Sequence, residues 1–493
     1  MDFKPNIFMD NFNKAKLLFD EGMKFLHEKN YLESERKFMS SLNLLPERLS
    51  IVGNLFTIYF NTNNKSQLKI LLNKYKNYSD KKEILYGKAI NFYFDQKFLE
   101  SIKICNKLIE FNDIEIFILD LLALNYQKKF LFLDSIKILR KRLNKKKDSS
   151  AYYNIGNFFY EIGKPHQAYY YFNKSKDLNS SDKSNLWNLS LCALNLEKLE
   201  LGFSLYENRW LKKTNNEKKK FTEIKLPFNL KDIKNKSLLI SDEQGLGDTI
   251  QFSRFVIDLL KYTKNITFVV NIKLVEIFKN LDKNIKIVNE SNLSLSKFEY
   301  HIPLCSLPKF LNIKKKTDIN FYKLTIPKKA FAELKNDNCL NVGISWSGNP
   351  NYTRDKYRSI SFDKIEKLLL KNKDINFYKL SRDIKKNNLN DYELFPNLID
   401  LSEKNLFEIA KTIGQFDLVV SSDTSIIHLA GILNIQSILL LNYNSDWRWF
   451  LEKKETTWYP SVTIIKQNKL NSWDNVFIEL NKILKSKKKR QRG

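Results

Sequence analysis

The sequence predicts an α-helical repeat region followed by an α/β region with two parallel sheets. Small residues recur every 33 or 34 positions in the first 210 residues. After residue 236, apolar runs of strand length alternate with helical patterns, which is typical of parallel sheets with helices on both faces. The chain has 493 residues, too many for one hydrophobic core and enough for several domains.

The repeats are recognised by small residues at two phases. The first phase holds Gly22, Ala89, Ala123, Gly156 and Ser190, and the second, twelve positions later, holds Ser34, Ser101, Ser135, Ala168 and Gly202. The interval from Gly22 to Ala89 is two repeat lengths, and a degenerate unit near Leu55 and Gln67 fills it. This pattern resembles the tetratricopeptide repeat (TPR), a helix-turn-helix of about 34 residues. We expect a TPR solenoid over 1–210 whose groove binds a protein or glycan acceptor. A passive spacer or an oligomerisation module is the alternative.

The α/β region is expected to form two Rossmann-like domains, over 236–330 and 338–484. A lysine-rich linker (211–235) precedes them, and a basic tail (485–493) is expected to be solvated and frayed. The expected strands are 237–241, 266–271, 285–288, 340–346, 375–380, 418–421 and 437–441. The expected helices are 248–261, 274–281, 362–370, 406–414 and 425–433. Ligands of such folds bind beyond the carboxyl ends of the strands.

Composition narrows the functional classes. The net charge of +28 would suit nucleic acid, an anionic membrane surface or anionic substrates. Its basic residues are diffuse outside the tail, so we expect general attraction of anions and no nucleic-acid partner. The four cysteines and four histidines are scattered, which argues against a disulfide framework or a metal site. With no signal-like segment and no run of about 20 apolar residues, we expect a cytoplasmic protein with possible peripheral membrane contact.

The first of three notable loops follows the strand 237–241. Gly245 and Gly247 straddle one residue, and Asp248 and Thr249 begin a helical pattern. Glycine lets the backbone turn tightly and approach a ligand, and free amides at a helix start attract phosphate. Taken alone, the pattern is equally consistent with an ordinary tight turn and a helix cap.

The second loop follows the strand 340–346. It contains Ser347, Gly348 and Asn349, and the basic residues Arg354, Lys356 and Arg358 come shortly after. Its small hydroxyl and amide groups suit a polar ligand, whereas a solvated basic loop is the simpler interpretation.

The third loop follows the strand 418–421. Asp423, Thr424 and Ser425 stand at a helix start, and His428 lies one turn further, on the same face as Thr424. Amides and hydroxyls at such an end suit a diphosphate. A helix cap and a packing histidine are the simpler alternatives.

The motifs in these loops resemble bacterial TPR proteins with a glycosyltransferase-like C-terminal domain. The motifs are Gly245–Phe252, Trp346–Pro350 with Arg358–Ile360, Ser422–Gly431, Asp446–Trp449 and Trp458–Ser461, together with the junction Tyr206–Trp210. That domain is similar to the lipopolysaccharide heptosyltransferases and, more distantly, to the O-linked N-acetylglucosamine transferase. The resemblance implies a GT-B fold that transfers a sugar from a nucleotide-sugar co-substrate, without a metal or another cofactor.

The resemblance also implies roles for individual residues. Asp248 matches a general base that accepts the proton of the acceptor hydroxyl, and Arg358, with Lys356 next, matches the cation that stabilises the leaving diphosphate. On the donor side it implies Asp423, Thr424, Ser425, His428, Ser347, Gly348 and Asn349, and on the acceptor side Gly245, Gly247 and Thr249.

Some positions depart from the heptosyltransferase pattern. Those enzymes usually carry a lysine at the place of Arg358 and a histidine-containing segment at the place of Ile250 and Gln251, and they lack the repeats. The sugar, whether hexosyl, heptosyl or N-acetylhexosaminyl, therefore stays open. Trp447, Arg448 and Trp449 could pack against the cleft or stack on a base or sugar.

Two other functional classes remain open. The chain could be a TPR interaction scaffold with a catalytically degenerate transferase domain, which would bind no nucleotide-sugar. It could also bind nucleic acid or a membrane surface through its net charge, with steep salt dependence. A glycosyltransferase is the interpretation that the motifs favour.

Overall fold

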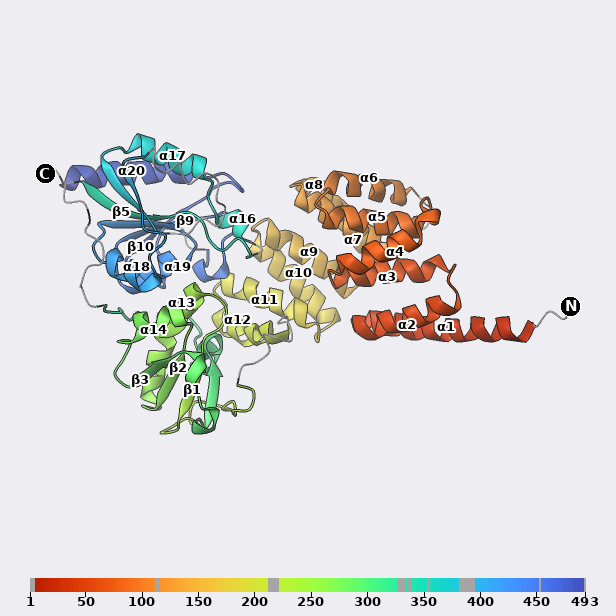
Figure 1. Cartoon of the computed structure of the whole chain (residues 1–493), viewed down its shortest axis with the longest axis horizontal. Coiled ribbons are helices and arrows are strands. Elements are labelled where there is room, and N and C mark those ends of the chain that lie inside the picture. Colours follow the sequence, from red (N-terminus) through yellow and green to blue (C-terminus); the bar gives the residue numbers. More distant parts are fainter. Residues whose placement is uncertain are drawn as a thin grey trace. The chain divides into compact units, whose positions relative to one another are not determined.

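The computed structural model describes residues 5–110, 115–211, 221–326, 334, 339–352, 354–380, 395–451 and 454–491. The chain divides into two compact units, 1–158 and 159–493 (Figure 1). No helix in the described part of the chain is long and apolar enough to cross a lipid bilayer. Most of the predicted split between the two sheets, at 330–338, lies outside the described residues, as does the linker segment 212–220.

The predicted helical repeats are confirmed. The first unit contains α1 (Pro5–His27), α2 (Tyr31–Leu44), α3 (Leu49–Asn61), α4 (Lys65–Lys74), α5 (Lys82–Phe94), α6 (Phe98–Ile109), α7 (Ile116–Lys128), α8 (Phe132–Lys145) and most of α9 (Ser149–Glu161). The second unit continues with α10 (Pro165–Leu178), α11 (Lys183–Asn195) and α12 (Leu199–Tyr206). Within each unit the two helices of a repeat pack against each other: α1 with α2, α3 with α4 (the degenerate unit), α5 with α6, α7 with α8, and α11 with α12.

The small residues lie where the helices of one repeat cross. Ser34 Oγ donates to the Gly22 carbonyl at 2.8 Å, and Ser101 Oγ donates to the Ala89 carbonyl at 2.8 Å. A Cβ at Gly22 would lie 2.8 Å from the ring of Phe38. Serine is therefore favoured at the second small position of the repeat, because its hydroxyl bonds the backbone of the other helix where the two helices cross.

A second periodic feature carries almost no sequence signal. The turn inside each repeat has one residue with positive φ, between 55° and 70°: Lys29, Asn63, Gln96, Phe130, Gly163 and Glu197. This conformation favours glycine, yet glycine occupies it once. Glycine spacing therefore could not have located these turns.

We predict that Gln96→Gly stabilises the repeat region. Gln96 is exposed with φ of 60°, and relief of a left-handed backbone is expected to raise the free energy of unfolding by about 1 kcal/mol. Lys103→Gly, at an exposed position inside α6, is the control and should lower it by about 1 kcal/mol. Thermal unfolding of both variants measures the two effects, and destabilisation by Gln96→Gly would contradict the prediction.

The smaller sheet is wholly parallel, in the order β3-β2-β1-β4. Its strands are β1 (Leu238–Ser241), β2 (Ile266–Val269), β3 (Ile285–Val288) and β4 (Tyr300–Pro303), and its helices are α13 (Leu246–Asp258), α14 (Ile272–Phe278) and α15 (Leu307–Phe310). The expected strands match β1 to β3. β4 was not predicted, because its short run ends in a proline, which a strand tolerates at an edge.

The larger sheet is also parallel, in the order β10-β9-β8-β5-β6-β7. Its strands are β5 (Leu340–Ser345), β6 (Ile375–Lys379), β7 (Leu398–Asp400), β8 (Leu418–Ser422), β9 (Ser437–Leu441) and β10 (Val462–Lys466). Its helices are α16 (Asp355–Arg358), α17 (Phe362–Lys371), α18 (Leu406–Ile413), α19 (Ser425–Ile432) and α20 (Asp474–Gln491). Figure 1 shows α17 and α20 on one face of this sheet and α18 and α19 on the other.

Three differences from the expected elements concern the edges and the end of the larger domain. The edge strands β7 and β10 were not predicted, although the apolar residues of β10 could have indicated it. The tail expected to fray from residue 485 is helical, because α20 continues to Gln491. Lys487 bonds Gln436 and Lys488 pairs with Asp374, and both contacts hold this helix against the domain.

The last repeats share one hydrophobic core with both sheets. Phe203 and Tyr206 from α12 belong to the same buried cluster as Leu238 of β1 and Trp447 of the second domain. At the junction, Arg209 and Glu243 form a buried bidentate ion pair, with both N–O distances at 2.8 Å. The end of the solenoid is thus built into the α/β unit.

Candidate functional site

One cavity of about 1030 Å³ lies where β1, β5 and β8 end. In both sheets the chain order reverses beside these strands, between β1 and β4 and between β5 and β8. Parallel α/β sheets bind ligands at such switch points. Every predicted site residue lines this cavity: Gly245, Gly247, Asp248, Thr249, Ser347, Gly348, Asn349, Arg358, Asp423, Thr424, Ser425 and His428.

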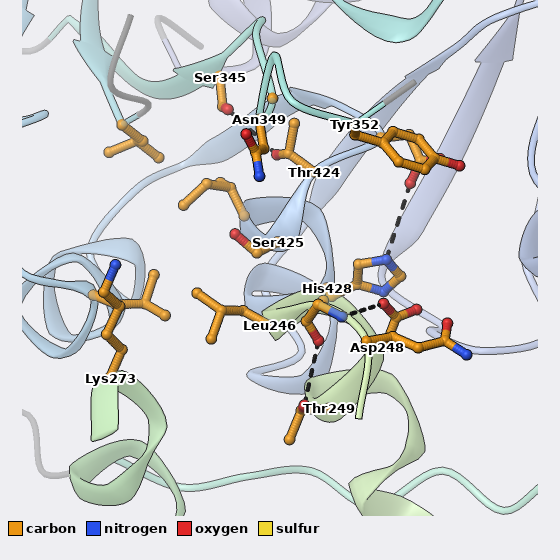
Figure 2. Close-up of a pocket in the computed structure, with 18 of the residues that line it drawn as sticks. Leu246, Asp248, Thr249, Lys273, Ser345, Asn349, Tyr352, Thr424, Ser425 and His428 are labelled. Atoms are coloured by element: carbon orange, nitrogen blue, oxygen red, sulfur yellow. Dashed lines mark hydrogen bonds and ion pairs between the residues drawn. The ribbon is translucent and has the colours of Figure 1, made fainter. Parts of the chain in front are cut away.

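The first wall is the glycine turn between β1 and α13. Gly245 caps the helix, its N–H donates to Asp248 Oδ2 at 2.8 Å, and Thr249 Oγ1 donates back to its carbonyl at 3.2 Å. A Cβ on Gly247 would lie 2.8 Å from His428 Cδ2. Glycine at this position therefore allows the first turns of α13 and α19 to approach, as Figure 2 shows with Asp248 beside His428.

Arg448 faces Asp248 from the second domain. Its Nη2 lies 2.7 Å from Asp248 Oδ1, and its Nη1 lies 2.8 Å from Asp446 Oδ1. Spacing in the sequence could not reveal the pair of Arg448 and Asp248, since two hundred residues separate them. Only the motif Asp446–Trp449 indicated that the segment around Arg448 is of interest.

Two opposing effects act on the Asp248 carboxyl. Burial raises the pKa of Asp248, while the Arg448 guanidinium and the Gly245 N–H stabilise the carboxylate and oppose that rise; the balance leaves the pKa above its usual value. Oδ2 of this carboxylate accepts the Gly245 N–H, and Oδ1 forms the ion pair with Arg448. A buried carboxylate with an elevated pKa can accept a proton.

The second wall is the first turn of α19. Thr424 caps this helix with an extended backbone, and its hydroxyl lies 3.0 Å from Ser421 Oγ and 3.4 Å from Ser345 Oγ. Figure 2 shows Ser345, Thr424 and Ser425 together on one side of the cavity. The first amides of a helix have no intrahelical partner and carry partial positive charge, so this end favours an anion.

His428 is held neutral by its surroundings. Burial, with the guanidinium groups of Arg448 and Arg254, lowers its pKa to about 3. Nδ1 lies 3.0 Å from the Tyr459 hydroxyl, and the ring stacks on Trp449 at 5.1 Å. The 4.0 Å approach of Nε2 to Asp423 is therefore a polar contact, because the imidazole is uncharged at neutral pH.

Asp423 titrates closer to neutrality than an ordinary aspartate. Burial and the neighbouring Asp446 carboxylate raise its pKa to about 6, against the opposing effect of Arg358. The folded state therefore binds more protons than the unfolded state between about pH 4 and pH 6, and the free energy of unfolding falls as pH rises through that range.

We predict that Asp423→Asn stabilises the protein above pH 6. Removal of the ionised carboxylate is expected to raise the free energy of unfolding by about 2 kcal/mol at pH 7.5. The gain should shrink to a small remainder near pH 4, where the folded aspartate is protonated and the unfolded aspartate is close to its ordinary pKa of 3.8. Unfolding midpoints of wild type and variant, measured from pH 4 to pH 8, test this, and a gap independent of pH would contradict it.

The loop after β5 positions Arg358 beside the same wall. Arg358 Nη1 donates to the Asp423 carbonyl at 2.7 Å, and Nε donates to Asp355 Oδ1 at 3.0 Å. A Cβ on Gly348 would lie 2.6 Å from atoms of both Arg358 and Asp355. Among the described residues the cavity wall includes Arg358 and not Lys356, so the structure favours the first of the two candidate cations.

The tryptophans of the motif Asp446–Trp449 have packing roles. Trp447 is 1% exposed and Trp449 is 0% exposed, so neither offers a ring to the cavity. Sequence reasoning also missed Lys273 and Lys404, which line the cavity; in Figure 2 Lys273 lies across it from Asp248. No three His, Cys, Asp or Glu side chains gather to hold a metal ion within the described ranges.

The described elements form helical TPR-like repeats followed by two parallel-sheet α/β domains. The chain is similar to TPR proteins over its N-terminal part and to heptosyltransferase structures over its C-terminal part, at low sequence identity. No family model matches the chain, and no curated protein matches its sequence.

The similar solved structures include proteins of both kinds. The APC/C heterotetramer Cut9–Hcn1 is 15% identical, with a TM-score of 0.37. The match covers 40% of this chain and 38% of the Cut9–Hcn1 chain. The E. coli ADP-heptose lps heptosyltransferase II is 11% identical, with a TM-score of 0.35 over 51% of this chain and 99% of that one. The iron-containing dodecameric glycosyltransferase TibC from enterotoxigenic E. coli H10407 is 11% identical, with a TM-score of 0.37. The match covers 53% of this chain and 78% of the TibC chain.

Proposed function

We propose that the protein is a glycosyltransferase that moves a sugar from a nucleotide-sugar donor to a protein or glycan acceptor. One observation carries the proposal. A single cavity sets the Asp248 carboxylate of the first domain against the α19 amide end and the Arg358 guanidinium of the second. A proton acceptor opposite a diphosphate-binding end is the arrangement that metal-free glycosyl transfer needs.

In the proposed reaction the donor diphosphate binds at Thr424, Ser425 and Arg358. The acceptor hydroxyl approaches from the side of Gly245 and Gly247 and transfers its proton to Asp248. Its oxygen bonds to the anomeric carbon as the bond from that carbon to the diphosphate oxygen breaks. The electron pair of the broken bond leaves with the nucleoside diphosphate.

The leaving group develops negative charge that the second domain can stabilise. The first amides of α19 and the Arg358 guanidinium together provide fixed positive charge without a metal ion. His428, neutral and packed on Trp449, can bond the donor sugar or a phosphate oxygen without adding charge. The groove of the repeats is the proposed site for the acceptor chain or a partner protein.

A donor screen by thermal shift tests the proposal. The full-length protein is heated with UDP-, ADP-, GDP- and CMP-sugars, including ADP-D-β-D-heptose, because a ligand that binds only the folded state raises the unfolding midpoint. A rise with one nucleotide class, reduced in Arg358→Gln, supports the proposal. If the folded protein binds none of them, the scaffold alternative is favoured and the proposed function is wrong.

A further inference from the structure

We infer that the last helical repeat is part of the catalytic centre: Tyr206 and Gln244 hold the Arg448 guanidinium against Asp248. Both are positioning residues that act through Arg448. The inference rests on the proposed function only for the role of Asp248 as the base, since the contacts themselves are independent of any reaction.

The contacts form a continuous chain from the repeat to the carboxylate. Arg448 Nη2 donates to Gln244 Oε1 at 2.8 Å and to the Tyr206 hydroxyl at 3.3 Å, and it pairs with Asp248 at 2.7 Å. Gln244 Nε2 in turn donates to the Tyr206 hydroxyl at 2.8 Å. One nitrogen of the guanidinium is therefore fixed by the repeat, the glycine turn and the base together.

The side chain of Gln244 bridges Tyr206 and Arg448 from a left-handed backbone. Its φ is 66°, a conformation that costs a non-glycine residue about 1–2 kcal/mol. Gln244→Gly therefore removes the bridging amide while relieving the backbone.

The repeat holds Tyr206 rigidly. Its ring packs against Trp187 at 4.9 Å and Trp447 at 5.6 Å between ring centroids. Three residues further, Arg209 forms its buried pair with Glu243, and Arg209 Nη2 also donates to Ser306 Oγ at 2.6 Å. These contacts join the end of α12 to the first domain and pack the tyrosine ring on two sides.

The charges around Arg448 determine how the Asp248 pKa would change if the guanidinium were displaced. Arg448 stabilises the ionised form of Asp248, so a displaced guanidinium would raise the pKa of that carboxyl further. Asp446 lies 2.8 Å from Nη1 and would keep Arg448 nearby. The charged and titratable groups that act on Asp248 or Arg448, besides each other, are Asp446, Glu243, Tyr206, Cys305, Tyr459, His428, Asp423 and Tyr352.

Two variants test the inference. Tyr206→Phe keeps the packed ring and removes the hydroxyl, and Gln244→Gly relieves the backbone while removing the amide. Each is expected to lower kcat about tenfold, the effect of one hydrogen bond to a charged group. Each should also move the acid limb of the pH profile of kcat/KM upward by about one pH unit, with the midpoint of thermal unfolding of Gln244→Gly no lower than that of wild type. Tyr378→Phe, which loses a bond to Asn341 outside the cavity, is the matched control and should leave kcat and the profile unchanged.

A second readout separates this inference from the proposed function. The Asp248 carboxyl is titrated by NMR in protein labelled at the aspartate carboxyl carbons, with its signal identified by Asp248→Asn. A higher Asp248 pKa in both variants supports the positioning role, even if the wild type transfers no sugar and the proposed function fails. An unchanged Asp248 pKa and an unchanged pH profile in an active enzyme would overturn the inference while leaving the proposed function intact.

Discussion

Asp248→Asn is expected to lower kcat for sugar transfer by about 10²- to 10⁴-fold, the contribution of a general base. The amide retains the shape of the carboxylate and can still accept the Gly245 N–H bond, but it cannot take up a proton. Donor binding should change little, because Asp248 lies on the first domain, opposite the α19 end. Steady-state kinetics with the donor identified by thermal shift measures the loss.

The matched control for this variant is Asp282→Asn, in the same domain. Asp282 Oδ1 accepts the Asn284 N–H at 2.8 Å, outside the cavity, so kcat should stay within about twofold. Asp248→Ala provides the companion test and should be as inactive as the asparagine variant while remaining folded. Near-full activity in either Asp248 variant would show that another group accepts the proton.

Arg358→Gln is expected to cost about 10²- to 10³-fold in kcat, because one fixed cation is lost where the leaving diphosphate becomes charged. It should also weaken binding of the free nucleoside diphosphate, which carries the same phosphates. Arg358→Lys should recover part of the activity, since the ammonium supplies charge without the bond to the Asp423 carbonyl. Calorimetry with the nucleoside diphosphate and kinetics with the donor separate the two effects.

Lys356 offers the control on the same short helix. Its ammonium lies 5.0 Å from the ring of Tyr357, and it does not line the cavity among the described residues. Lys356→Ala removes an equal charge only two residues away and should leave kcat within about twofold. Equal losses in Lys356→Ala and Arg358→Gln would indicate a general effect of net charge rather than a contact with the leaving group.

Local pattern was sufficient for much of the architecture. The repeat phase reports helix crossings directly, because a residue such as Gly22 has no room for a side chain against Phe38. The strands β1, β5 and β8 are short apolar runs whose following loops contain glycine, serine or threonine, and the alternation of such runs with helical patterns predicts a parallel sheet. Edge strands such as β4 are less apolar, so their pattern is weaker.

Sequence spacing could not predict the contacts between distant segments of the chain. Examples are the ion pair of Arg448 with Asp248, the close approach of Gly247 to His428, and the bond from Arg358 to the Asp423 carbonyl. The elevated pKa of Asp423 and the neutral state of His428 likewise depend on burial among distant charges, which residue identity does not reveal.

By itself, the sequence determined a helical repeat region, a following pair of parallel α/β domains and the loops that line one cavity. These depend on properties that repeat locally: side-chain size at helix crossings, apolar alternation, and glycine before a helix. The tertiary structure decided that the last repeat shares a core with both sheets and that Tyr206 bonds Arg448 beside Asp248. Such contacts form only when packing brings distant segments together, since the orientation of each side chain depends on neighbours that no local pattern specifies.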